Sequence, residues 1–376
     1  MTTEAYFDYA ASAPPFPEAL RYFEEASVLL FGNPSSTHGR GRQVREALDR
    51  ARHAVLAKLG FEGGRLVLTS GATEANNLVI RGALDADPSA RLLLAADAHA
   101  SAWFAKELFG KRVDVLDVGN DGRISPARLD AQLSRKTGLV SILHANNETG
   151  VLNDVKALGE ACAAAGVPLH VDGVQSVGHL PLTLSELPFA YYTFSAHKFG
   201  GPPGVGGLIA RNVDLPPLIA GGGQESGIRG GTENVTGLLA AAVALDLSVR
   251  ALDEEAPRLR TLARSLVVDL KAAFPDAIVN SDAEAGLPGL VSISFPGLIG
   301  EELVLEMDLR GYEISAGSAC GSGKREPSRP LMAMGRTREQ ALGTVRISMG
   351  RHTTPAAVAG LGAALRAAVE KQKALA

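Results

Sequence analysis

Short apolar runs alternate along the chain with longer segments in which apolar residues recur every three or four positions. A clear helical pattern covers residues 42–59, where Gly60 ends an apolar face formed by Val44, Leu48, Ala51, Val55 and Leu59. Seven apolar runs have the length of buried strands, at residues 66–69, 92–95, 113–116, 139–143, 169–171, 191–194 and 206–210. Strands that alternate with helices favour an α/β fold with a seven-stranded, mainly parallel sheet.

Polar residues directly follow five of these expected strands. They are residues 70–73, His99, Asn146 with Asn147, Asp172, and residues 195–198. In open α/β sheets, ligands bind beyond the carboxyl ends of the strands. The five strand ends therefore predict one active-site rim.

The second half of the chain has a different pattern. Two long helical patterns, at residues 233–252 and 258–274, flank a charged stretch with Pro257, where we expect a domain boundary. Apolar runs at 290–295 and 345–348 and a final helix from Pro355 indicate a smaller α+β domain. The expected large domain covers residues 14–252, and the small domain combines residues 1–13 with 253–376.

Composition and charge exclude several classes of protein. The 376 residues carry 37 basic and 41 acidic side chains, which leaves no electrostatic footprint for nucleic acid or an anionic membrane surface. No uninterrupted apolar stretch reaches the ~18 residues of a membrane span, and the N-terminus lacks the pattern of a signal peptide. We therefore expect a cytoplasmic protein. Two cysteines, Cys162 and Cys320, are too few for a disulfide framework or a structural zinc site, and no metal site is expected.

Lys198 lies between an expected buried strand and a Gly/Pro-rich loop, in SAHKFGGPPG at residues 195–204. A desolvated lysine has a lowered pKa and can form a Schiff base, although a solvated loop lysine would fit the same pattern. Asp172, at an earlier strand end, could hold a pyridine nitrogen protonated and make the ring an electron sink. A strand-end cap or surface turn is the alternative interpretation of Asp172.

The segment TSGATE at residues 69–74 is typical of a strand-to-helix turn whose backbone N–H groups bind phosphate. Helix capping alone would also explain its Ser and Thr. Neither G-x-x-x-x-G-K-[ST] nor strand–G-x-G-x-x-G–helix occurs in the sequence, so the usual nucleotide motifs are missing. A phosphate site beside a Schiff-base lysine and a pyridinium acid points to pyridoxal phosphate.

Nine segments between Tyr6 and Thr354 carry a resemblance to a known family. They are YFDYAASAPP, FGNPSSTHGRGR, TSGATEANN, HANNETGV, HVDGVQSVG, SAHKFGGPPGVGG, GGGQESGIRGGTENV, SAGSACGSG and VRISMGRHTT. In this order the chain resembles the cysteine desulfurases, fold-type I pyridoxal-phosphate enzymes of the class V aminotransferase superfamily. One departure is Ser226, which stands where that family usually has Arg.

The resemblance implies a set of cofactor contacts. Lys198 would hold pyridoxal phosphate as a Schiff base, Asp172 would pair with its pyridine nitrogen, and Gln175 would hydrogen-bond its ring hydroxyl. His99 would stack on the ring and help to move protons. The phosphate would be held by Ala72, Thr73, Ser195 and His197, joined by Thr232 from the second subunit of a homodimer.

The resemblance also implies how substrate and sulfur are handled. Asn147, which would contact the cofactor as well, and Arg346 would hold L-cysteine, with Arg346 clamping the carboxylate in a two-pronged bond. Cys320 lies among small residues that offer no apolar packing, which indicates an exposed thiol whose thiolate is a nucleophile. Cys162, in a helical pattern, fits a small buried hydrophobe instead. Cys320 would take the sulfur as a persulfide, release L-alanine, and supply a sulfur-acceptor protein or an iron–sulfur scaffold, or tRNA thiolation.

Three alternatives remain open at the level of the sequence. A selenocysteine lyase could use the same residues, whereas an aminotransferase on this fold has no need of Cys320. A non-catalytic pyridoxal-phosphate binder acting as a regulator or scaffold would not need the thiol either.

Overall fold

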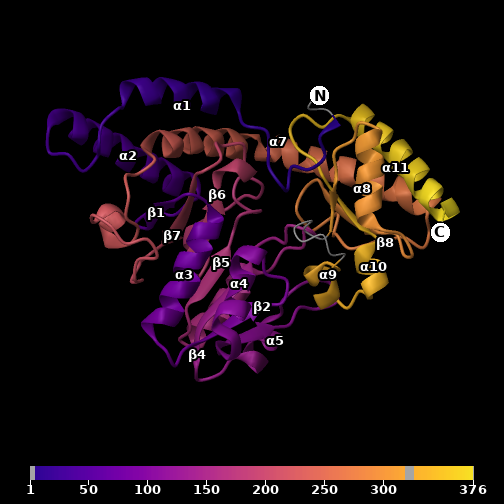
Figure 1. Ribbon diagram of the computed structural model, residues 1–376, viewed down its shortest axis with the longest axis horizontal. Helices are drawn as coiled ribbons and strands as arrows, with labels where there is room; N and C mark the ends of the chain where they lie inside the picture. Colours follow the sequence, from indigo (N-terminus) through magenta and orange to yellow (C-terminus); the bar gives the residue numbers. More distant parts are fainter. Residues whose placement is uncertain (1–4, 318–325, 376) are drawn as a thin grey trace.

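The computed structural model describes residues 5–317 and 326–375 of the chain. A seven-stranded sheet with the strand order β1-β7-β6-β5-β4-β2-β3 forms the centre of the larger unit (Figure 1). Its strands are β1 (Arg65–Thr69), β2 (Arg91–Ala95), β3 (Val113–Leu116), β4 (Thr137–Leu143), β5 (Leu169–Asp172), β6 (Tyr191–Ser195) and β7 (Gly206–Ala210). β7 is antiparallel to both neighbours, and the other neighbouring strands are parallel. The mainly parallel, seven-stranded sheet predicted from the sequence is confirmed.

Helices cover both faces of this sheet. They are α2 (Gly39–Lys58), α3 (Ala72–Ala86), α4 (Ala100–Phe109), α5 (Pro126–Gln132) and α6 (Val155–Ala164), while α1 (Pro17–Leu29) packs against α7 (Val235–Ala273). Strand side chains alternate between the two faces. Val67 therefore packs into the core shared with α3 and α4, whereas Leu66 and Leu68 pack into the core shared with α2 and α6.

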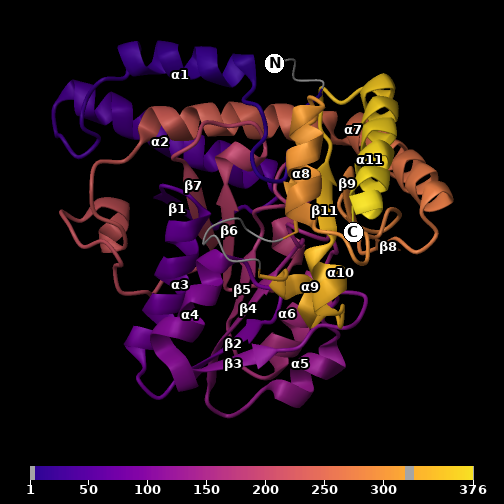
Figure 2. The same cartoon turned by 45° about the vertical axis from the view of Figure 1, so that its right-hand side comes forward.

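The smaller unit packs four antiparallel strands, in the order β10-β11-β9-β8, against helices (Figure 2). Its elements are β8 (Ile278–Val279), β9 (Leu290–Ser294), α8 (Gly300–Leu309), β10 (Ser315–Ala316), β11 (Thr344–Ser348) and α11 (Pro355–Leu375). The N-terminal segment joins this unit, because Phe7 belongs to its core and Asp8 forms a β-bridge with Ser348. Two short helices, α9 (Arg329–Ala333) and α10 (Arg338–Leu342), precede β11, and Leu331 of α9 packs into the core of the larger unit.

A single helix, α7 (Val235–Ala273), joins the two units (Figure 1). The sequence-based expectation of two helices separated near Pro257 is wrong, since Pro257 lies inside α7. Proline removes one backbone donor from a helix, but Leu245 on one side packs in the larger core and Leu262 on the other packs in the smaller core. Burial on both sides offsets that loss. One window of α7 is long and apolar enough to cross a membrane, and half of this window is buried inside the protein.

The strand ends predicted to form a rim lie at one edge of the large sheet. β2, β4, β5 and β6 are mutually parallel, and β1 has the same direction because it is antiparallel to β7, which is antiparallel to β6. Their carboxyl ends therefore meet, and the smaller unit closes the space beyond them.

Candidate active site

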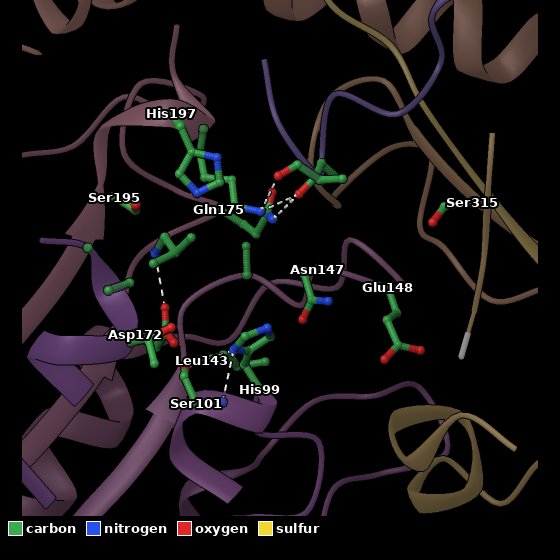
Figure 3. A pocket seen from close by; sticks show the side chains of 18 of the residues that line it. His99, Ser101, Leu143, Asn147, Glu148, Asp172, Gln175, Ser195, His197 and Ser315 are labelled. Atoms are coloured by element: carbon green, nitrogen blue, oxygen red, sulfur yellow. Dashed lines mark hydrogen bonds between the residues drawn. The ribbon is translucent and has the colours of Figure 1, made fainter. Parts of the chain in front are cut away.

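A cavity of about 700 Å³ opens at this edge of the sheet. Ten of the residues predicted to form the site line it: Ala72, Thr73, His99, Asn147, Asp172, Gln175, Ser195, His197, Lys198 and Arg346. Figure 3 shows several of these side chains around one space, from elements far apart in the sequence. Strand ends of the larger unit supply one wall, and Ser315 and Arg346 of the smaller unit supply the other.

Lys198 lies at the end of a short 3-10 helix, Ala196–Lys198, which directly follows β6. Its Nζ donates hydrogen bonds to the carbonyl oxygens of Ala10 (2.7 Å) and Ala11 (2.8 Å). Burial, reinforced by the positive charge of Arg346, lowers the pKa of Lys198 to about 8. The amine is therefore far easier to deprotonate near neutral pH than an ordinary lysine.

Asp172 is the last residue of β5 and is buried. Its Oδ2 accepts a hydrogen bond from Nδ2 of Asn76 (2.8 Å), and its Oδ1 accepts one from the backbone N–H of Val174 (3.1 Å). These donors fix the carboxylate and leave it as an acceptor toward the cavity. Sequence reasoning missed Asn76, whose only signal is a polar residue on the buried face of a helix.

His99 is the N-cap residue of α4, and its Nδ1 accepts from the backbone N–H of Ser101 (3.1 Å). Because that N–H can only donate, Nδ1 is unprotonated and Nε2 carries the ring proton. Burial, together with the charges of Lys198 and Arg329, lowers the pKa of His99 against the opposing effect of Asp172. The ring is therefore neutral at physiological pH.

A hydrogen-bond chain links His99 to Asp172. Asn76 uses its Nδ2 to donate to both Asp172 and Oγ of Ser101 (2.9 Å), and Oγ of Ser101 lies 2.7 Å from Nδ1 of His99. The residue predicted to stack on the cofactor ring and the residue predicted to pair with its nitrogen are thus held by one network. Ser101 is a second residue that the sequence did not single out.

The part of the cavity at the start of α3 is suited to bind an anion. Ala72 and Thr73 begin α3, and the N-terminus of a helix presents unpaired backbone N–H groups with a partial positive charge. Ser195 and His197 lie beside it. A Cβ at Gly206 of β7 would stand 2.5 Å from Cα of Gly71, so glycine is what allows β7 to pass so close to this turn.

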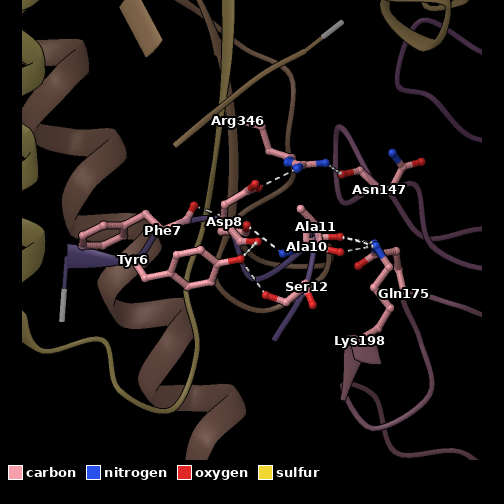
Figure 4. A network of polar contacts seen from close by, with 11 residues as sticks. Tyr6, Phe7, Asp8, Ala10, Ala11, Ser12, Asn147, Gln175, Lys198 and Arg346 are labelled. Carbon is pink, nitrogen blue, oxygen red and sulfur yellow. Dashed lines mark hydrogen bonds and ion pairs between the residues drawn. The ribbon is translucent and has the colours of Figure 1, made fainter. Parts of the chain in front are cut away.

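Arg346 extends from β11 toward Asn147 and the N-terminal segment (Figure 4). Its Nη2 forms an ion pair with Oδ1 of Asp8 (2.6 Å), and its Nη1 donates to the carbonyl oxygen of Asn147 (2.8 Å). Its Nε is buried without a hydrogen-bond partner among the described residues. Both terminal nitrogen atoms of the predicted carboxylate clamp are therefore already engaged within the chain.

Two predicted site residues are not placed in the cavity. Thr232 is exposed, on the loop before α7, and does not line the cavity; its predicted role in a second subunit stays a prediction. Cys320 lies outside the described residues. Cys162 is buried on α6, and burial raises the pKa of its thiol to about 12.

The residues present fit pyridoxal phosphate. A half-buried amine, a fixed carboxylate and a helix N-terminus surround one cavity, matching the aldehyde, the pyridine nitrogen and the phosphate of that molecule. Gln175 also lies at the cavity, although its Nε2 donates to the carbonyl oxygen of Ala10 (2.8 Å), which leaves its Oε1 toward other groups.

Comparison with known proteins identifies the family. The sequence model described as aminotransferase class-V matches residues 5–361. The chain belongs to this family. Among class-V relatives, a cysteine desulfurase IscS of Dictyoglomus turgidum is 36% identical over 361 residues, covering 94% of this chain and 91% of that protein. A cysteine desulfurase of Cereibacter sphaeroides is 38% identical over 377 residues, covering 98% of this chain and 97% of that protein.

Solved class-V structures agree with this assignment. A NifS-like protein matches with a TM-score of 0.89 at 30% identity, over 98% of this chain and 100% of that one. SspA in complex with cysteine matches with a TM-score of 0.78 at 28% identity, over 93% and 100%. The predicted resemblance to the pyridoxal-phosphate-dependent cysteine desulfurases is confirmed.

Proposed function

We propose that this protein is a cysteine desulfurase that converts L-cysteine into L-alanine and receives the sulfur on Cys320 as a persulfide. The observation that carries the proposal is the half-buried Lys198 amine, with its lowered pKa, in one cavity with Asp172 and Arg346. The family relationship supplies the reaction type, because the relatives with the same whole-chain coverage are named cysteine desulfurases.

Bound pyridoxal phosphate supplies an electron sink for the negative charge that develops at the substrate Cα. Lys198 would hold the cofactor, Asp172 would keep its ring nitrogen protonated, and the start of α3 with Ser195 and His197 would hold its phosphate. Asp172 is suited to its role because Asn76 and the N–H of Val174 already fix its carboxylate.

The chain's own groups can move the protons of the reaction. Lys198, with a pKa of about 8, can take a proton from the substrate Cα and return it without a large penalty. His99 holds its proton on Nε2, the ring nitrogen that Ser101 does not engage. Arg346 would orient the substrate by its carboxylate, beside Asn147.

Cys320 completes the balance of the reaction. Its thiolate attacks the sulfur of the substrate, an S–S bond forms, and the substrate Cβ–S bond breaks. The substrate carbon takes up a proton, so that L-cysteine and one enzyme thiol yield L-alanine and one enzyme persulfide. No external oxidant or reductant is needed until the persulfide is passed to an acceptor.

We infer further that the protein acts as a homodimer in the cytoplasm and passes sulfur to an acceptor protein or an iron–sulfur scaffold. Support for a second subunit comes from Thr232, which belongs to the predicted phosphate site and yet is exposed and outside the cavity of its own chain.

The proposal is tested by the products. Purified protein carrying pyridoxal phosphate should convert L-cysteine in the presence of dithiothreitol into equimolar L-alanine and sulfide. L-Serine, which has the same carboxylate and amine but no sulfur, should yield no alanine. Turnover of L-cysteine to pyruvate or to a keto acid, with no alanine, would contradict the proposal.

A further inference from the structure

The carboxylate of Asp8 pairs with the guanidinium group of Arg346, the group that is expected to bind the carboxylate of the substrate. Its Oδ1 lies 2.6 Å from Nη2 of Arg346, and the Arg346 side chain is only 8% exposed, against 22% for Asp8. Figure 4 shows the two side chains pointing toward each other, and Arg346 also lines the cavity. An ion pair so little exposed to solvent is poorly screened, so the charge of Asp8 acts strongly on Arg346.

The backbone around Asp8 is held in place from several sides. The Tyr6 hydroxyl donates to the carbonyl oxygens of Asp8 (3.0 Å) and Ser12 (2.7 Å), and the N–H of Ala11 donates to the Asp8 carbonyl (3.0 Å). The N–H of Ala10 donates to Oγ of Ser348 (2.9 Å), and Ser348 lies two residues after Arg346 on β11. The backbone of Asp8 is therefore held beside β11, which keeps the Asp8 carboxylate within reach of Arg346.

A substrate carboxylate must enter this arrangement as a further negative charge. One Nη of Arg346 already pairs with Asp8, and the other already donates to the carbonyl oxygen of Asn147. The incoming group either displaces Asp8 or binds beside it, and the charge of Asp8 opposes binding in both cases.

We infer that Asp8 sets the affinity of the site for the amino acid, as an internal carboxylate that competes with the carboxylate of the ligand for Arg346. The inference rests on the proposed function in assigning Arg346 to the substrate carboxylate. Cysteine and its product alanine carry the same group, so Asp8 weakens the hold on both. The charge of Asp8 thereby assists the departure of alanine, whereas it does not oppose a ligand without a negative carboxylate.

The test is a binding titration of the protein carrying pyridoxal phosphate, followed by the change in cofactor absorbance. Asp8→Asn keeps the shape and a hydrogen-bond acceptor but removes the charge. We expect it to bind L-alanine three- to tenfold more tightly than the wild type, with binding of L-alaninamide unchanged within twofold. Glu313→Gln serves as the matched control, because Glu313 pairs with the same N-terminal segment through its backbone, and it should leave both affinities unchanged.

Asp8→Ala provides an independent readout. Removal of the side chain leaves space beside Arg346, so added acetate should fill it and compete with L-alanine in this variant and not in the wild type. L-Alanine affinity that is equal or weaker in Asp8→Asn, or acetate that has the same effect on Asp8→Ala and wild type, would overturn the inference. Since alanine binding requires no sulfur chemistry, these results are separate from a failure to release alanine from cysteine, which would overturn the proposed function instead.

Discussion

At the residue scale, the site depends on the protonation state of Lys198. An ammonium group cannot attack a carbonyl, and the neutral amine is favoured here first by burial and then by Arg346, which lower the pKa to about 8. Above that pH the free amine of the cofactor-free protein is mostly neutral, and below it the amine is mostly protonated.

The pH dependence of cofactor loading follows from this pKa. When cofactor-free protein is mixed with pyridoxal phosphate, the rate of covalent attachment should rise with pH and level off above about pH 8. Stopped-flow absorbance measures the rate, and Lys198→Ala, which has no amine at this position, should give no attachment and no wild-type absorbance band. A rate that still climbs steeply between pH 9 and 10 would indicate an ordinary lysine.

Arg346 should not be replaceable by lysine. Lys at position 346 keeps a positive charge but cannot contact Asp8, Asn147 and a substrate carboxylate with a planar fork of donors. Arg346→Lys should weaken L-alanine and L-cysteine binding by about 1.5–3 kcal/mol, the range of a hydrogen bond to a charged group. Absorbance titration measures the loss, and unchanged affinity for both amino acids would place the carboxylate site elsewhere.

At the element scale, the predicted strands of the large sheet are confirmed because each is a short apolar run in a sheet that is covered on both faces. The prediction of α7 is wrong at Pro257, because it considers only the helix stability that a proline costs locally. It does not consider the packing of α7 into two hydrophobic cores, which offsets that cost. Asn76, Ser101 and Asp8 were missed for a related reason. A polar residue on a helix or in an N-terminal segment does not by itself indicate a site, and only the fold brings these three beside Asp172, His99 and Arg346.

The close approach of β7 to the start of α3 gives a prediction at this scale. In Gly206→Ala, the new Cβ would lie 2.5 Å from Cα of Gly71, so the turn that precedes Ala72 has to move. The variant should retain pyridoxal phosphate less well during dialysis and unfold at a lower temperature than the wild type. Gly39→Ala is the control, because its Cβ would meet only a side-chain atom of Arg42 at 3.8 Å. Equal cofactor retention by Gly206→Ala and wild type would remove the start of α3 from the phosphate site.

At the scale of the whole molecule, the cavity lies between two units that α7 holds together, and each unit contributes essential groups. The larger one supplies Lys198 and Asp172, and the smaller one supplies Arg346. The resemblance to the cysteine desulfurases also implies a homodimer, in which Thr232 of one subunit is expected to contact the cofactor phosphate bound by the other.

Complementation between two defective subunits tests this expectation. Thr232→Ala should weaken cofactor retention in the partner's site, and Lys198→Ala should abolish attachment in its own. In a mixed dimer of the two variants, one site combines an intact Lys198 with an intact Thr232, so the mixture should recover part of the retained cofactor and activity. No recovery in a mixture that demonstrably forms mixed dimers would contradict a shared site.

The persulfide on Cys320 tests the central claim most directly. Wild-type protein loaded with pyridoxal phosphate and given L-cysteine without reductant should gain the mass of one sulfur atom, which peptide mass spectrometry should locate on the peptide that contains Cys320. Cys320→Ala should still change its absorbance on binding L-cysteine, because Lys198, Asp172 and Arg346 are intact, but it should produce only a trace of alanine. Desulfuration at the wild-type rate by Cys320→Ala, or added sulfur found only on Cys162, would contradict the account.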